Sequence, residues 1–199
     1  MLVRPAGDFG AIVDVPDNET AVRLARLLRE EQSALIDVVV GHQTVLVTWP
    51  DGEAIPNLPA LAERALVPEA ARSGRRIEIP VTYDGPDLET VAGLTGLSPE
   101  EVIARHTGVE HVVAFLGFQP GFAYLLGGDE RLHVPRLDEP RTHVPAGTVA
   151  IAGPYSGVYP RESPGGWRLL GTTTTVMFDP AREEPALLAP GDHVGFMAA

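Results

Sequence analysis

Apolar and polar positions alternate in three short stretches near the start of the chain. Residues 11–15, 35–40 and 44–49 are rich in β-branched side chains, and this pattern predicts three strands. Residues 41–43 lie between the last two runs and predict a tight connection. Helical patterns interleave with these strands, so the predicted order is β-α-β-β-α. A unit of this order closes as a small sandwich, with helices on one side of an antiparallel sheet.

Both predicted helices have a continuous apolar face. The first follows Asp17 and Asn18, whose side chains are favourable N-caps. Its apolar residues recur with the helical period, at Ala21, Leu24, Ala25 and Leu28. The second helix begins near Pro59. Its apolar face consists of Leu58, Leu61, Ala62, Ala65 and Leu66.

A polar stretch that contains a glycine, residues 72–76, predicts a domain boundary. We therefore expect an α+β domain at residues 1–75 and a second domain at residues 76–199. The second domain opens with an alternating strand at residues 77–83, and two short helices follow it.

The second of these short helices has strong start and stop signals. Ser98 is its expected N-cap, Pro99 occupies the first helical position, and Glu101 completes a capping box. Gly108 is expected to end the helix.

From residue 112 onward, short apolar runs alternate with clusters of glycine and proline. This spacing predicts an all-β barrel or sandwich with elaborate loops. The runs are residues 112–118, 148–152, 167–170, 174–178, 186–188 and 193–196. The predicted fold class is therefore α+β followed by all-β.

Composition narrows the function. The chain has 199 residues, of which 44% are hydrophobic, so it can bury a core as one large or two small domains. A net charge of -12 opposes nucleic acid as a partner. No run reaches the roughly 18 apolar residues of a membrane span. The N-terminus lacks a signal pattern, so we expect a cytoplasmic protein.

Two absences remove whole classes of chemistry. The sequence has no cysteine, which excludes disulfides, thiol catalysis and thiolate metal sites. It also has no lysine, because all 15 basic residues are arginine. This excludes a Schiff base, a P-loop lysine and a biotin attachment site. Arginine must therefore bind any phosphate or carboxylate, through its planar bidentate fork.

Residues 117–124 are the densest candidate segment. Three aromatic residues lie there between glycines and a proline, where neither a helix nor a strand continues. Such a loop either lines a pocket or meets a partner, or it is a buried turn, and the two alternatives are equally good from sequence alone. The candidate binding residues in it are Phe118, Gln119, Pro120, Gly121, Phe122 and Tyr124.

Arg136 and Arg141 lie in loops fixed by prolines and form a candidate anion site. The alternative is two solvated surface arginines, which is the better interpretation of the two residues taken alone. Further along, glycine-rich turns offer backbone N–H groups to an anion, although the same pattern is typical of barrel hairpins. The candidates there are Gly147, Gly153, Tyr159, Ser163, Gly165, Gly166 and Trp167.

His106 is the one candidate acid or base that titrates near neutral pH. It lies beside Val102 and Ile103 on the helix that begins after Ser98. A histidine on an apolar face is more often a core residue than a general base. The six histidines form no HExxH motif, so no protein-bound metal is expected, and no serine lies in a nucleophile elbow. No autonomous catalytic set is visible.

Together these motifs closely resemble one family, which is called allophanate hydrolase subunit 1, 5-oxoprolinase B-type subunit or KipI-like. The resemblance covers nearly the whole chain. The motifs that carry it are residues 115–122, 135–136, 140–141, 144–147, 151–153, 157–160, 163–167 and 190–196.

The resemblance implies a small α+β domain followed by a cyclophilin-like β-barrel. It implies a second, barrel-like hydrolase subunit as partner, of the kind called allophanate hydrolase subunit 2 or 5-oxoprolinase C-type subunit, and a third protein that completes 5-oxoprolinase. The implied reaction is the ATP-dependent opening of 5-oxoproline to glutamate, with ATP as its magnesium complex. The older name implies hydrolysis of allophanate.

An unstrained lactam is a poor electrophile, and phosphorylation of its oxygen creates a leaving group, so coupling to ATP is chemically reasonable. In that scheme Arg136 and Arg141 neutralise phosphates or the substrate carboxylate. Aromatic side chains wall a dry pocket, and His106 is the candidate general base. The pocket walls are Phe118, Phe122, Tyr124 and Trp167.

Departures from the family pattern leave the substrate open. Pro154 and Tyr155 stand where relatives commonly have a glutamate and a glutamine, and Thr172 stands where they have an arginine. Ala123 replaces a proline. The alternative function is a regulatory protein that inhibits a sensor histidine kinase, as the KipI name implies. We give the enzyme subunit more weight, because glycine, arginine and aromatic residues converge on loops that suit a small polar ligand.

Overall fold

The computed structural model describes residues 1–52, 57–67 and 74–199. The chain divides into two compact units, Met1–Ser73 and Gly74–Ala199. The predicted boundary segment begins at residues 72 and 73, which lie outside the described residues. No helix in the described part of the chain is long and apolar enough to cross a membrane.

The first unit contains a four-stranded antiparallel sheet of order β1-β2-β4-β3. The three predicted strands are confirmed as β2 (Gly10–Asp14), β3 (Asp37–Val40) and β4 (Thr44–Thr48). The edge strand β1 (Leu2–Pro5) was not predicted. Its side chains are mostly exposed, so the sequence has no alternation of apolar and polar residues that would indicate a strand there.

Both predicted helices of this unit are confirmed. In α1 (Asn18–Glu31), the side chain of Asp17 accepts a hydrogen bond from the backbone N–H of Thr20 at 2.7 Å. This is the N-cap that the sequence predicts. The apolar face of α1 packs against β3 and β4, and α2 (Leu58–Ala65) packs against α1.

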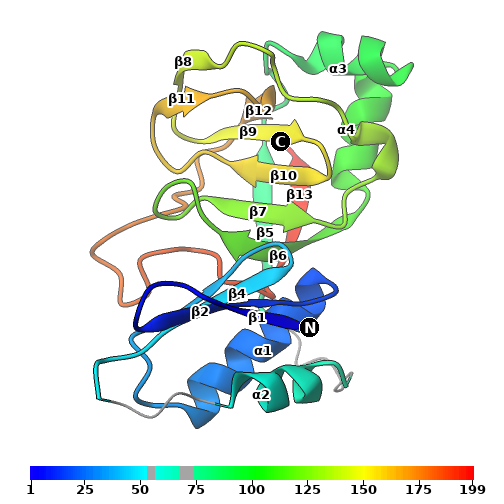
Figure 1. The fold of residues 1–199 in the computed structure, drawn as a ribbon. Coiled ribbons are helices and arrows are strands. Elements are labelled where there is room, and N and C mark those ends of the chain that lie inside the picture. Colours follow the sequence, from blue (N-terminus) through cyan, green and yellow to red (C-terminus); the bar gives the residue numbers. More distant parts are fainter. Residues whose placement is uncertain (53–56, 68–73) are drawn as a thin grey trace. The chain divides into compact units, whose positions relative to one another are not determined.

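The second unit contains a seven-stranded sheet whose neighbouring strands are antiparallel, except for the parallel pair β13 and β5 (Figure 1). The strands in spatial order are β12 (Arg168–Thr172), β9 (Thr148–Ala152), β10 (Tyr155–Val158), β7 (Ala123–Leu126), β6 (Glu110–Leu116), β13 (His193–Ala198) and β5 (Arg76–Val81).

This sheet is nearly closed into a barrel. Just beyond β5, Thr82 exchanges two backbone hydrogen bonds with Thr172 of β12, at 2.8 and 2.9 Å, and so joins the two edge strands. A Cβ atom at Gly171 would collide with the carbonyl oxygen of Thr82. The close approach of the two edges therefore requires glycine at this position.

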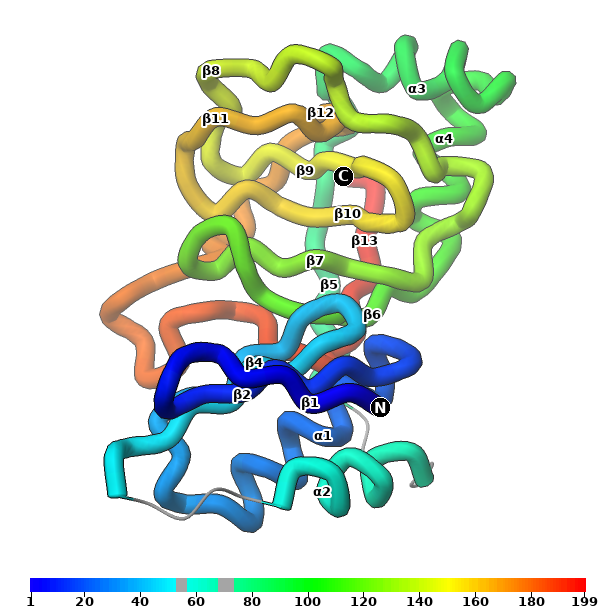
Figure 2. Tube along the Cα trace, viewed as in Figure 1, coloured from blue at the N-terminus to red at the C-terminus, as the bar shows by residue number. Residues whose placement is uncertain are grey.

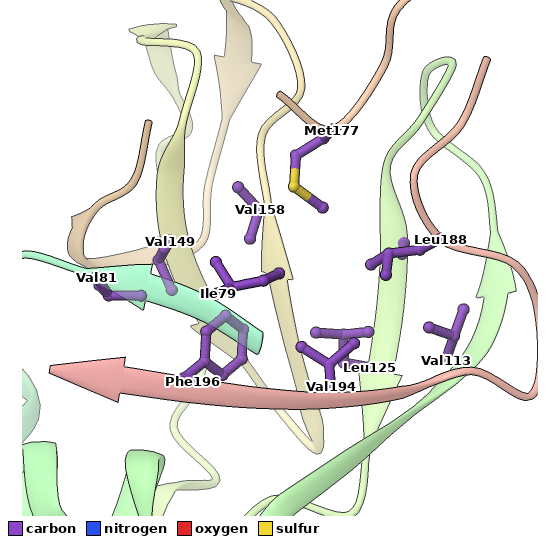
Figure 3. Packing of buried hydrophobic residues seen from close by; sticks show 11 residues of the cluster. Ile79, Val81, Val113, Leu125, Val149, Val158, Met177, Leu188, Val194 and Phe196 are labelled. Carbon is purple, nitrogen blue, oxygen red and sulfur yellow. The ribbon is translucent and has the colours of Figure 1, made fainter. Parts of the chain in front are cut away.

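Apolar side chains from most of the strands fill the barrel (Figure 3). Met177 and Leu188 belong to this core although neither lies in a strand of the sheet. The prediction of strands at residues 174–178 and 186–188 is wrong. Only a single bridge, between Phe178 and Ala186, connects them. The segment turns inward to fill the barrel instead of extending the sheet.

Two helices and a 3-10 turn pack around a second cluster of apolar side chains. They are α3 (Leu88–Thr95), α4 (Pro99–Thr107) and η1 (Glu130–Leu132). The predicted capping box of α4 is confirmed, because the side chain of Ser98 and that of Glu101 each bond to the other residue's backbone N–H.

A small two-stranded antiparallel sheet of β8 (Arg141–Val144) and β11 (Ser163–Gly165) lies beside the barrel strands (Figure 2). Neither strand was predicted, because both are short and interrupted by proline or exposed polar residues. This pairing brings the candidate Arg141 next to the segment that contains the candidates Ser163 and Gly165.

Candidate functional site

The candidate aromatic residues gather on the outer face of the barrel sheet. On β7, Ala123 and Leu125 point into the barrel core, so strand alternation places Tyr124 on the opposite face. Phe122 packs on that face with Tyr159, Val144 and neighbouring residues of β9 and β12. We call this surface the outer aromatic face. Its members are Phe115, Phe118, Phe122, Tyr124, Tyr155, Tyr159 and Trp167.

Phe122 is the centre of the outer aromatic face. Its ring contacts four others edge-to-face, with centroid distances between 5.1 and 5.4 Å. These partners are Phe118, Tyr124, Tyr159 and Trp167. Edge-to-face geometry is favourable for aromatic pairs and fixes the ring positions. The structure therefore joins all five aromatic candidates into one cluster.

The loop that precedes Phe122 is tightly hydrogen-bonded. The backbone N–H of Gly117 donates to the carbonyl of Phe122 at 3.1 Å, and the N–H of Phe122 donates to the carbonyl of Gln119 at 3.0 Å. Gly121 has a φ of 81° and packs directly against Phe178, where a side chain would clash. This glycine therefore allows the loop to turn and approach the neighbouring segment.

Phe118 has an unusual backbone. Its φ of 65° is the one positive value at a non-glycine residue in the described part of the chain. A left-handed conformation costs an L-residue about 1–2 kcal/mol, and it is rarest for bulky side chains. The ring is nevertheless 61% exposed, whereas Phe122 is buried. Backbone strain of this kind is concentrated at functional sites.

Gln119 braces the loop against the β10–β11 connection. Its amide oxygen accepts a hydrogen bond from Nε of Arg161 at 3.1 Å. Its amide nitrogen lies 3.5 Å from the carbonyl of Arg161 and from Oγ of Ser163. The sequence candidates Gln119 and Ser163 therefore meet, and Arg161 joins them although sequence reasoning did not select it.

Gly165 allows Tyr159 to reach the sheet of β8 and β11. A Cβ atom at Gly165 would collide with the hydroxyl oxygen of Tyr159. Burial raises the pKa of the Tyr159 hydroxyl above its ordinary value, and a hydrogen bond with the backbone of Trp167 partly offsets this. Gly165 is thus needed for close packing, which is a structural role for one of the glycine candidates.

Arg141 is held in a largely buried ion pair. Its guanidinium donates to Oδ1 of Asp87 at 2.7 Å, and a second nitrogen lies 3.5 Å from the carbonyl of Trp167. Asp87 also accepts a hydrogen bond from the backbone N–H of Leu169 at 2.8 Å. Arg141 therefore lies beside the outer aromatic face, but Asp87 neutralises much of its charge. Sequence reasoning missed Asp87, because its partners are distant along the chain.

Arg136 is exposed, and within the described residues it makes no ion pair or side-chain hydrogen bond. The loop around it is attached to β12, since Nε of Arg168 donates to the carbonyl of Pro135 at 3.1 Å. The N–H of Leu137 donates to the carbonyl of Gly166 at 2.7 Å. Arg136 thus projects from a fixed loop with its charge available.

The remaining glycine candidates lie in turns. The N–H of Gly147 donates to the carbonyl of Tyr159, and its carbonyl accepts from Thr173. The N–H of Gly153 donates to the carbonyl of Val134. These two N–H groups are used within the protein and are not directed at a ligand. Pro120 is exposed in the Phe118 loop.

His106 belongs to a different cluster, inside the second unit. Its Nδ1 lies 2.7 Å from the hydroxyl of Tyr83, and its Nε2 lies 3.2 Å from Oγ of Ser156. Ser156 in turn lies 3.2 Å from Nε2 of His111. The imidazole of His106 stacks on Phe196 with a centroid distance of 4.5 Å.

Burial lowers the pKa of His106 to about 3, with a smaller effect from His111, and burial lowers the pKa of His111 to about 4. His106 is 1% exposed, and both of its ring nitrogens have partners. A general base must reach its substrate, so this position favours the alternative interpretation of His106 as a core residue.

Comparison with known proteins places this geometry in a family. A model of the carboxyltransferase domain, subdomains C and D, matches residues 1–188. The B-type subunit of 5-oxoprolinase from Escherichia coli O157:H7 is 46% identical, over 94% of this chain and 80% of that protein. The chain belongs to the family of 5-oxoprolinase B-type subunits. Another member, from Haemophilus influenzae, is 40% identical over 87% of this chain and 83% of that protein.

Solved structures share the fold of this chain. The crystal structure of TTHA0988 is similar with a TM-score of 0.84 and 38% identity, over 96% of this chain. The match covers 40% of the TTHA0988 chain. The urea amidolyase of K. lactis shares the fold, with a TM-score of 0.76 at 20% identity, and the match covers 15% of its chain. The fold of this family thus also occurs inside much longer polypeptides.

Proposed function

We propose that this chain is a subunit of a 5-oxoprolinase complex, which opens the lactam of 5-oxoproline to glutamate with hydrolysis of ATP. The observation that carries the proposal is the 46% identity to the Escherichia coli protein named as a subunit of 5-oxoprolinase, over nearly the whole chain. The complex contains a second hydrolase subunit, of the 5-oxoprolinase C-type, and a third subunit, and it acts in the cytoplasm. A cyclophilin-like identity of the barrel is part of the same proposal.

The dependence on partners has support in the residues themselves. A hydrolytic site needs a nucleophile or a general base within reach of the substrate. The outer aromatic face offers rings and guanidinium groups, and the titratable His106 is enclosed elsewhere. This chain therefore contributes binding and charge, and the partner proteins contribute the group that activates water.

The outer aromatic face suits a small amide. Phe122, Tyr124 and Trp167 form a wall of fixed rings that excludes water on one side. Arg136 carries an available positive charge for the substrate carboxylate or a phosphate group. Arg141 lies at the edge of the wall, where Asp87 holds it in place.

ATP fits this set of residues as a co-substrate. The chain has no lysine, and the fork of its arginine side chains binds phosphate oxygens well. ATP supplies a phosphoryl group that turns the lactam oxygen into a leaving group. Magnesium arrives with the nucleotide, and Arg136 compensates for the phosphate charge that the ion leaves uncovered.

Substitution of Arg136 in the reconstituted complex tests this site. Because the Arg136 side chain makes no polar contact within the described protein, we expect Arg136→Gln to leave the free energy of unfolding within about 0.5 kcal/mol of wild type. We expect kcat/KM for 5-oxoproline or ATP to fall about tenfold or more, since a charged hydrogen bond to the ligand is lost.

Arg182→Gln is the matched control, because Arg182 is also on a loop but pairs with Asp179. Its steady-state kinetics should match those of wild type. Unchanged kinetics in Arg136→Gln, measured for both substrates, would remove Arg136 from the proposed site.

A further inference from the structure

Phe118 projects from the outer aromatic face instead of closing a core. The ring contacts Phe122 and Tyr159 by its edge, and most of its surface faces solvent. A glycine would adopt the same positive φ without strain. The chain instead keeps a large aromatic side chain at this position. The ring therefore has a use that contacts inside the chain do not explain.

The backbone beneath this ring is fixed before any partner arrives. Hydrogen bonds between Gly117, Gln119 and Phe122 close the loop, and the side chain of Gln119 bonds to Arg161. An exposed aromatic ring on a fixed loop loses little conformational freedom on binding. Such rings, together with arginine, are typical of the residues that dominate protein–protein binding energy.

Arg161 is fixed beside this loop without being neutralised. Its Nε donates to a neutral oxygen of Gln119, and among the described residues no carboxylate lies within ion-pair distance of it. Both terminal nitrogens remain for an external group. The group that best complements this guanidinium is a carboxylate of another molecule.

The relatives indicate what this molecule is. In TTHA0988 the region that matches this chain makes up 40% of one polypeptide, so the larger part of that chain lies outside the match. The same fold occupies 15% of the K. lactis urea amidolyase chain. In these proteins the matched region is therefore joined to further protein. The Escherichia coli relative is named as a subunit instead, which favours a separate chain as the equivalent of that further protein.

We infer that the outer aromatic face, with Phe118 as its central contact and Arg161 at its rim, docks a separate polypeptide that corresponds to the part of TTHA0988 outside the match. The partner surface has an apolar pocket for the Phe118 ring and a carboxylate for Arg161. This inference rests on the proposed function, and it names the surface at which the partner completes the site. The partner covers the open side of the ring wall.

Phe118→Gly separates binding from folding. Removal of the ring should weaken the complex with the purified partner about 30-fold or more, measured as Kd by isothermal titration calorimetry. The thermal unfolding midpoint should stay close to that of wild type, because relief of the positive φ offsets the lost edge contacts. Phe118→Tyr keeps the ring and should bind like wild type.

Leu94→Ala is the control, since Leu94 is 52% exposed on α3 and belongs to no part of the outer aromatic face. Its Kd should not change. Arg161→Glu should weaken binding and reduce its dependence on salt. An unchanged Kd in Phe118→Gly would overturn the inference.

The two proposals can fail separately. If Phe118→Gly loses the partner but the wild-type complex hydrolyses no ATP with 5-oxoproline, the docking surface stands and the proposed reaction is wrong. If the complex is active and Phe118→Gly binds its partner normally, the reaction stands and the docking surface is wrong.

Discussion

Asp87 organises the edge of the candidate site through three contacts. One carboxylate oxygen accepts from Arg141, and the other accepts from the backbone N–H of Leu169. Its own N–H donates to the carbonyl of Leu169. The residue is 5% exposed, so its charge depends on Arg141 for compensation. Arg141 is therefore a structural partner of Asp87 as well as a candidate for ligand binding.

We predict that Arg141→Ala destabilises the protein by about 2–3 kcal/mol, because it leaves a buried carboxylate without its counter-charge. The value lies below that of a fully buried pair, since the Arg141 side chain is 29% exposed. The double variant Asp87→Asn with Arg141→Ala should recover part of this loss. Urea unfolding of Arg141→Ala, Asp87→Asn and the double variant measures the coupling between the two side chains.

A strictly additive double variant would show that the two side chains do not depend on each other. Any loss of activity in Arg141→Ala must be compared with this loss of stability before it is assigned to catalysis. Arg136 is the better probe of ligand binding, because no carboxylate neutralises it in the described structure.

At the scale of elements, α4 is joined to the barrel through buried polar side chains. Hydrogen bonds run from Tyr83 through His106 on α4 and Ser156 on β10 to His111 on β6. Phe196 of β13 packs against both imidazoles. The Nδ1 atom of His111 is buried without a hydrogen-bond partner among the described residues. Protonation of either imidazole would place an unpaired charge in this core.

Stability should therefore fall in mild acid. Both histidines have folded-state pKa values below the ordinary value of about 6.5, so the unfolded chain binds protons first as the pH falls. Their contribution to the free energy of unfolding is complete above about pH 6.5 and is lost as the pH falls toward 4. Each histidine contributes up to about 1.4 kcal/mol per pH unit to the slope.

His111→Phe should reduce this pH dependence, because one of the two buried imidazoles is removed while the ring packing against Phe196 is kept. The exposed His133 provides the control, and His133→Gln should leave the slope unchanged. The measurement is the free energy of urea unfolding from pH 4.5 to 7.5. An equal slope in His111→Phe and wild type would contradict the proposed role of this cluster.

At the scale of the whole molecule, the sequence predicts helices and strands well where neighbouring residues determine them. The capping residues Asp17 and Ser98, the alternating runs at β3 and β4 and the apolar run at β9 predicted the correct elements. Long-range pairing did not follow from such signals. The apolar runs around Met177 and Leu188 have the residue pattern of strands, but these two side chains pack in the core of the barrel.

The candidate site was predicted in composition more than in geometry. The aromatic candidates meet on one face, whereas the glycine candidates Gly147 and Gly153 lie in turns and use their N–H groups within the protein. The ion pair of Arg141 with Asp87 could not be predicted, because 54 positions separate the two residues and neither lies in a recognisable pairing pattern. Nor does periodicity indicate that Phe118 has a positive φ, since an aromatic residue is a poor choice for that conformation.

The most direct test of the proposed function is reconstitution of the complex with and without this chain. ADP and glutamate are measured together, with 5-oxoproline present or omitted. We predict that both products form in equal amounts only when this chain, its partner proteins and 5-oxoproline are all present. The proposal would be contradicted if the mixture that lacks this chain formed as much ADP and glutamate as the complete mixture. ATP hydrolysis that 5-oxoproline does not stimulate would also contradict it.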